Sequence, residues 1–97
     1  MNIQAELEDP EMRVSYGVAT LKYDIAAALV AARKRKNLSQ AALATMAGVS
    51  HASMAKLESG EGNPTLSRVG ALFAALGVRC RISTAPLLAT DMRKGNT

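Results

Sequence analysis

The chain has 97 residues, with 12 basic and 8 acidic side chains, 48 % hydrophobic and 3 % aromatic content, one Cys and one His. This length excludes a two-domain enzyme, the scarcity of Cys and His excludes a disulfide framework and His–His metal sites, and no apolar run approaches the ~20 residues that span a bilayer. We therefore expect a cytoplasmic, mainly helical domain that is not an enzyme, holds no cofactor or metal, and has no membrane as partner.

Two helices are predicted in the first third of the chain. Residues 9–11, Asp-Pro-Glu, are typical of a helix start, because Asp caps free N–H groups, Pro fits the first position and Glu favours the positive end of the helix dipole. This short helix should weaken at Gly17. A longer helix, capped by Thr20, should follow and end in the basic run 33–36 before Asn37, a residue that tolerates the left-handed stop position.

Two short helices are predicted on either side of Gly48. Ser39 and Ser50 stand where the caps of these helices are needed. Gly48 permits the positive φ of a tight turn, Ala44 is small enough for two helices to cross closely, and Val49 fills the space between them. This pattern predicts a helix-turn-helix, whose second helix can lie in the major groove of DNA.

A further helix is predicted after the loop at Asn63-Pro64 and should end at Gly77. Residues 78–83 alternate apolar and polar side chains, which predicts a strand that ends near Pro86. A lone strand needs partners for its backbone N–H and C=O groups, and the sequence offers no second strand. We expect it to pair with the same strand of a second copy, giving a homodimer; the sheet edge of a toxin and an irregular arm are the alternatives. The residues expected in this dimer strand, with Cys80 buried on its apolar side, are Val78, Cys80 and Ile82.

Six short stretches between residues 32 and 78 agree in residue type and spacing with one known family. They are Leu38-Ser39-Gln40, Leu43-Ala44, Gly48-Val49-Ser50, Leu57-Glu58-Ser59-Gly60, Asn63-Pro64 and Ala74-Ala75-Leu76-Gly77. With them the chain resembles the Xre/Cro-type helix-turn-helix of phage repressors. The resemblance implies a mainly α fold, a five-helix bundle of the lambda-repressor-like DNA-binding type with a short C-terminal β-strand. We expect an acidic leader with a short helix over 1–19, the DNA-binding domain over 20–77 and a dimerisation arm over 78–97.

The two ends of the chain narrow this resemblance. Residues 9–13, which lead to Tyr16, and the predicted strand 78–83 resemble HigA-type antitoxins of type II toxin–antitoxin operons. That resemblance implies a protein that neutralises a RelE-like ribonuclease toxin. It also implies repression of the protein's own operon by a homodimer bound to a palindromic operator in double-stranded DNA.

The charge distribution is uneven along the chain. Residues 1–32 contain five acidic and two basic side chains, a net charge of −3, whereas residues 33–97 contain three acidic and ten basic ones, a net charge of +7. A basic body favours a polyanion such as DNA, and an acidic leader complements a basic toxin that binds RNA. A free-standing repressor without a toxin is the alternative, and a helical module that binds only protein is another.

The resemblance also implies which side chains meet DNA. Gln40 would hold a phosphate at the start of the first motif helix, where free N–H groups attract anions. His51, early in the second helix, would read a base edge, although it lacks the fork that Gln offers adenine. Lys56 would reach a guanine or a phosphate. The full set expected at the DNA is Arg35, Ser39, Gln40, Ser50, His51, Ala52, Ser53 and Lys56.

Three charged positions complete the expectations. Arg33 and Glu58 match a pair that forms a buried or half-buried ion pair in the family, which would serve the scaffold. Glu61 stands in the loop where phage repressors often carry basic residues, which weakens one expected phosphate contact. The basic residues Arg35 and Lys36 are expected to compensate.

Overall fold

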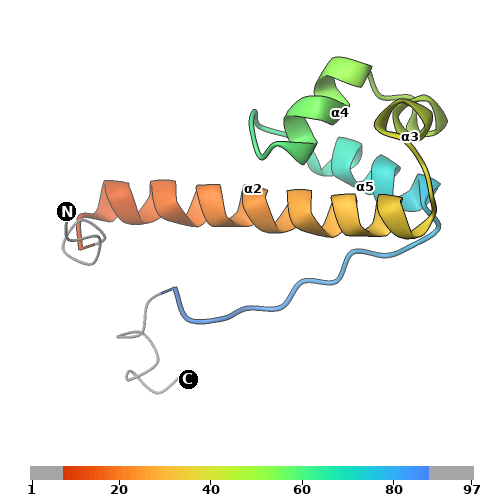
Figure 1. The fold of residues 1–97 in the computed structure, drawn as a ribbon. Helices are drawn as coiled ribbons and strands as arrows, with labels where there is room; N and C mark the ends of the chain where they lie inside the picture. The colour runs from red at the N-terminus through yellow and green to blue at the C-terminus, as the bar shows by residue number, and fades with distance from the viewer. Residues whose placement is uncertain (1–7, 88–97) are drawn as a thin grey trace. The chain divides into compact units, whose positions relative to one another are not determined.

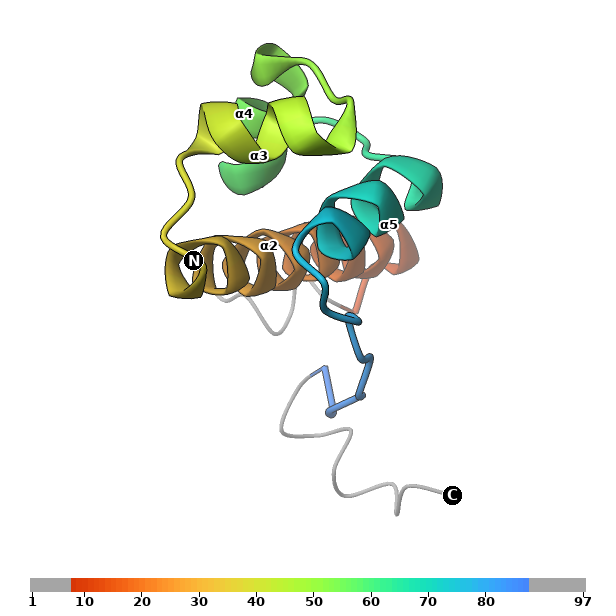
Figure 2. The ribbon, with the colours of Figure 1, turned by 90° about the vertical axis from the view of Figure 1, so that its right-hand side faces the viewer.

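Four helices form the regular structure of the computed structural model, which describes residues 8–87. They are α2 (Pro10–Arg35), α3 (Gln40–Ala47), α4 (His51–Glu58) and α5 (Leu66–Ala75) (Figure 1). Residues 21–80 form one compact unit, in which α3 packs against both α4 and α5. Figure 2 shows α3 and α4 on one side of the last part of α2.

The first helix is continuous, so the expected break near Gly17 was wrong. α2 runs for 26 residues through Gly17 and across the expected boundary between residues 19 and 20. Thr20, expected as a cap, lies inside the helix, where its hydroxyl donates to the Gly17 carbonyl at 3.0 Å. A glycine inside a helix costs only about 1 kcal/mol relative to alanine, which is too little to end a helix that can otherwise continue. Within residues 8–87 one continuous helix therefore stands where two were expected, and that part of the chain has four helices.

The three short helices begin where the sequence places polar caps. The hydroxyls of Ser39, Ser50 and Thr65 accept the backbone N–H three residues ahead, at 3.0, 3.0 and 3.1 Å respectively. α3 ends at Gly48, whose φ of 69° lies in the left-handed region that suits glycine. Caps and turn together set the crossing of α3 and α4 that a helix-turn-helix needs.

One hydrophobic core holds the unit together. Leu29 of α2, Leu43 of α3, Met54 of α4 and Leu72 of α5 are its largest fully buried side chains. Each helix therefore gives one large side chain to the same cluster, and α4 is fixed from its buried face while its opposite face stays open. The other buried members of the cluster are Ala32, Ala44, Leu57, Val69, Phe73 and Leu76.

The predicted strand is absent from the described residues. Residues 78–86 form neither helix nor strand, because a strand needs a neighbour for its N–H and C=O groups and no described segment pairs with it. Cys80, expected to be buried, is exposed, and Ile82 is 83 % exposed. The expected leader and arm also include residues 1–7 and 88–97, which lie outside the described part of the chain.

α2 is long and apolar enough, by length and composition alone, to cross a membrane, contrary to the expectation from the sequence. Core helices of soluble proteins meet the same criterion. The last part of α2 contributes to the core, since Leu29 and Ala32 pack there. The first part of α2 does not contribute to the core, because none of residues 10–25 is buried.

Candidate DNA-binding site

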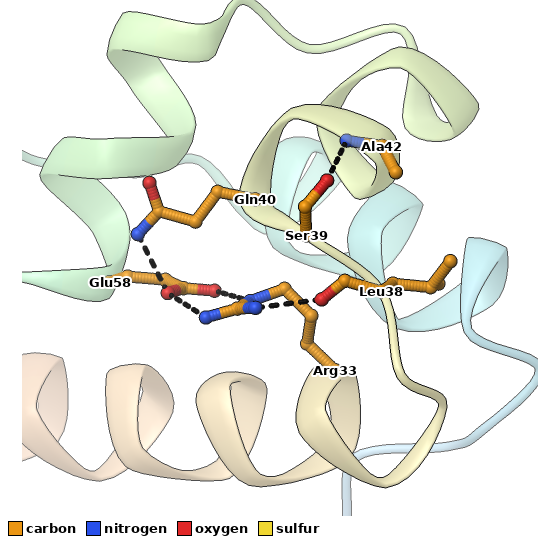
Figure 3. A network of polar contacts seen from close by, with 6 residues as sticks. All are labelled: Arg33, Leu38, Ser39, Gln40, Ala42 and Glu58. Carbon is orange, nitrogen blue, oxygen red and sulfur yellow. Dashed lines mark hydrogen bonds and ion pairs between the residues drawn. The ribbon is translucent and has the colours of Figure 1, made fainter.

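A hydrogen-bonded ion pair joins the end of α2 to the end of α4 (Figure 3). Arg33 Nε lies 2.6 Å from Glu58 Oε2, and Arg33 Nη2 donates to Glu58 Oε1 at 2.9 Å. The third guanidinium nitrogen, Nη1, donates to the Leu38 carbonyl oxygen at 2.7 Å. The Arg33 and Glu58 side chains are only 12 % and 5 % exposed, so this fork fixes the base of α4 in a site largely shielded from water.

The same contacts set the charge state of the pair. Burial alone raises the pKa of Glu58, but hydrogen bonds from Arg33 and Gln40, with the charges of Arg33 and Lys34, outweigh it and leave the pKa below its usual range. The hydrogen bond to Glu58 raises the pKa of Arg33, against the effect of burial. Both groups therefore stay charged across the physiological range.

Gln40, expected to hold a phosphate, is tied to this network. Its Nε2 donates to Glu58 Oε1 at 2.9 Å, while the side chain as a whole stays exposed at the start of α3. Figure 3 shows its amide oxygen pointing away from the carboxylate. The contact orients the amide and leaves one of its two N–H donors free for a ligand.

The outward side of α4 and the residue that caps it carry most of the side chains expected at the DNA. His51, Ala52 and Lys56 are exposed, and Ser53 is partly exposed. Ser50 precedes the helix, and its hydroxyl donates to Ser53 Oγ at 2.9 Å while accepting the Ser53 N–H. α4 is thus anchored by Met54 and Leu57 on one side and presents polar side chains on the other, as a helix must to enter a groove.

Two further expected residues lie at the ends of neighbouring helices. Ser39 caps α3 and is exposed, which leaves its hydroxyl accessible. Arg35 is the last residue of α2 and is also exposed. They stand on other elements than α4, so any contact they make with DNA would flank the contacts of that helix.

The structure adds a residue that the sequence analysis missed. A polar pocket of about 220 Å³ lies between α4, the loop 59–65 and the start of α5. Lys56 lines it together with Arg68, which stands in the first turn of α5. The sequence did carry a signal, because a cation in the first turn of a helix sits at the unfavourable end of the helix dipole.

Comparison with known proteins agrees with this geometry. The family model described as helix-turn-helix matches residues 29–82, more than half of the chain. No curated protein and no solved structure gives a significant match. The matched segment contains the core, the capped helix pair and the exposed face of α4, so the chain belongs to the helix-turn-helix family, in its Xre/Cro type, and is a sequence-specific DNA-binding regulator of transcription.

Proposed function

We propose that this regulator is an antitoxin, which represses its own operon as a homodimer on a palindromic operator and neutralises a RelE-like ribonuclease toxin in the cytoplasm. The observation that carries the antitoxin part is an exposed apolar surface on α2, outside the segment that matches the family. A helix-turn-helix needs no such surface to bind DNA.

Large apolar side chains crowd the first part of α2. Five of them are 45 to 71 % exposed. Val14, Val18 and Leu21 follow one another at spacings of four and three residues, so they lie on one face of the helix. Exposed apolar faces of this kind are typical of interaction sites, because binding a partner removes the apolar surface from water, which is favourable. The five residues are Met12, Val14, Val18, Leu21 and Tyr23.

Charge indicates the kind of partner. Glu8, Asp9 and Glu11 are exposed at the start of this helix, and the Asp9 carboxylate accepts the Glu11 N–H at 2.9 Å as an N-terminal cap. Proteins that bind and cleave RNA carry basic surfaces, which an acidic helix start complements. The apolar face would supply most of the affinity, and the acidic residues would guide the encounter.

The test is co-expression of the full chain with the product of each adjacent open reading frame. A small basic product should co-purify with the chain, and its toxicity should vanish when the chain is present. The double substitution Val14→Lys/Val18→Lys should abolish co-purification without changing DNA binding. Met46→Lys, which alters another exposed apolar residue of comparable type, should leave the complex intact.

A free-standing repressor would give a different result. In that case no neighbouring product would co-purify with the chain, and Val14→Lys/Val18→Lys would change neither co-purification nor DNA binding. Neither outcome affects the DNA-binding role, which rests on the helix-turn-helix.

The DNA-binding role has its own test. We expect His51→Ala to weaken binding to the operator more than binding to a random duplex, because contacts to bases depend on the DNA sequence and contacts to phosphates do not.

A further inference from the structure

We infer that a second apolar face of α2 receives a helix of the partner protein, and that one apolar side chain of that helix enters a cleft between α2 and the end of α4. The inference rests on the proposed antitoxin function and adds a docking site to the surface that contains Val14 and Val18. The cleft measures about 390 Å³ and lies between residues 23–31 of α2 and residues 58–60.

The side chains of this second face have the spacing of a stripe that packs against another helix. Tyr16, Tyr23 and Val30 are seven residues apart, and Met12 stands four residues before Tyr16. Seven residues make about two helical turns, so these side chains lie along one face of α2. Two residues turn a helix by roughly 200°, so Tyr23 points away from Leu21 and from the first apolar surface.

This face is open to solvent for most of its length. Met12 is 45 % and Tyr23 71 % exposed, while Val30 is half-buried and lines the cleft. The core of the unit takes Leu29 and Ala32 from α2 instead. An apolar face that the core does not use, and that leads to a cleft through an exposed tyrosine, is explained by a protein partner.

The charge of the cleft distinguishes a protein ligand from DNA. Its lining contains no Lys or Arg, so the cleft cannot neutralise a phosphate. The charged residue in the lining is Glu58, whose carboxylate already accepts hydrogen bonds from Arg33 and Gln40. The cleft therefore suits an uncharged, apolar side chain. Because Met12 and Tyr23 also belong to the exposed residues assigned to the toxin, we assign the docking helix to the toxin as well.

The shape of the site favours a helix over other ligands. A strand would need the free edge of a sheet, and residues 8–87 form no strand. A small molecule would be covered only in part, since Tyr23, Ala27 and Ala31 stay exposed, and small-molecule sites enclose most of their ligand. A helix with apolar side chains seven residues apart matches Tyr16, Tyr23 and Val30, and the alanines beside them let its backbone approach closely.

The experiment measures the affinity of the full chain for the small basic product of an adjacent open reading frame, by biolayer interferometry. We expect Ala27→Lys to weaken binding about 30-fold or more, because a charge at the cleft disfavours burial of an apolar side chain there. Ala27 is exposed and Lys favours helices, so the fold should be kept. Ala28→Lys, the matched control, makes the same change at the next exposed alanine, outside the cleft lining, and should bind like the wild type.

A second pair of variants tests whether a side chain enters the cleft. Ala31→Phe would fill the cleft with an apolar side chain of α2 itself, so we expect it to weaken binding although it adds no charge. Ala28→Phe should have no such effect. Circular dichroism verifies that each variant is folded.

The outcomes separate this docking site from the antitoxin function. If the wild type binds the product and Ala27→Lys behaves like Ala28→Lys, the docking site is wrong and the antitoxin function stands. If Ala27→Lys weakens binding but Ala31→Phe does not, the partner lies on the face without entering the cleft, and the insertion is wrong. If no adjacent product binds the wild type, the antitoxin function fails and the docking site fails with it.

Discussion

Arg33 and Glu58 illustrate how much of this fold depends on one pair of side chains. Their fork is largely buried, at 12 % and 5 % exposure, so removing one partner leaves the other charged group shielded from water without compensation. We expect Arg33→Met to lower the free energy of unfolding by about 3–5 kcal/mol, measured by urea denaturation. The double variant Arg33→Met/Glu58→Leu should recover most of this loss, because it removes both buried charges. Equal losses in the single and double variants would show that packing, rather than the unpaired carboxylate, sets the cost.

The lowered pKa of Glu58 makes the stability depend on pH in a defined direction. The folded protein holds fewer protons on this group than the unfolded chain, so its contribution is complete above the ordinary Glu pKa of ~4.3 and is lost as pH falls through the lower, folded value. We expect Glu58→Gln to flatten the fall in the free energy of unfolding below about pH 4.3. Glu61→Gln, which leaves Glu58 in place, should keep the acid sensitivity of the wild type. A full acid response in Glu58→Gln would assign that response to other groups.

At the scale of elements, two glycines have opposite roles. Gly17 lies in the regular part of α2, and a Cβ there would meet nothing within 4 Å, whereas Gly48 has a φ of 69° at the end of α3. Gly17→Ala should therefore stabilise the protein by up to about 1 kcal/mol, because alanine favours a helix. Gly48→Ala should destabilise it by about 1–2 kcal/mol, since only glycine adopts the left-handed region without cost. Urea denaturation checks both, and a loss of stability in Gly17→Ala would mean that α2 needs a break after all.

The caps and the turn were predictable from the sequence because each depends on a few neighbouring residues. Ser39 and Ser50 accept backbone N–H groups within one turn, and Gly48 acts through its own backbone. The continuity of α2 was not predictable from the same signals, because Gly17 and Thr20 are typical of helix ends but also fit a helix interior at small cost. Arg68 was missed for another reason. It lines the same pocket as Lys56 only because α5 packs within the same unit, and no local sequence pattern shows that two such distant residues share a pocket.

At the scale of the whole molecule, the number of chains that bind one operator can be predicted. The described residues contain one candidate recognition helix, α4, while a palindromic operator needs two such helices related by a two-fold axis. Residues 78–86 are neither helical nor paired, and Ile82 is 83 % exposed. Pairing of this segment with its copy would satisfy the N–H and C=O groups of two chains and bury Ile82.

We therefore expect the protein to sediment as a dimer, and Ile82→Lys to shift it to the monomer by placing a charge in the shared surface. The control is Tyr23→Lys, which changes a highly exposed residue on α2 rather than in the segment 78–86. This variant should remain dimeric in the absence of a partner protein. Because two half-sites are engaged together, loss of the dimer should weaken operator binding far more than binding of each chain to random DNA. A wild type that sediments as a monomer would argue against the dimer and against a palindromic operator. An Ile82→Lys variant that keeps the wild-type mass would place the contact between the two copies elsewhere.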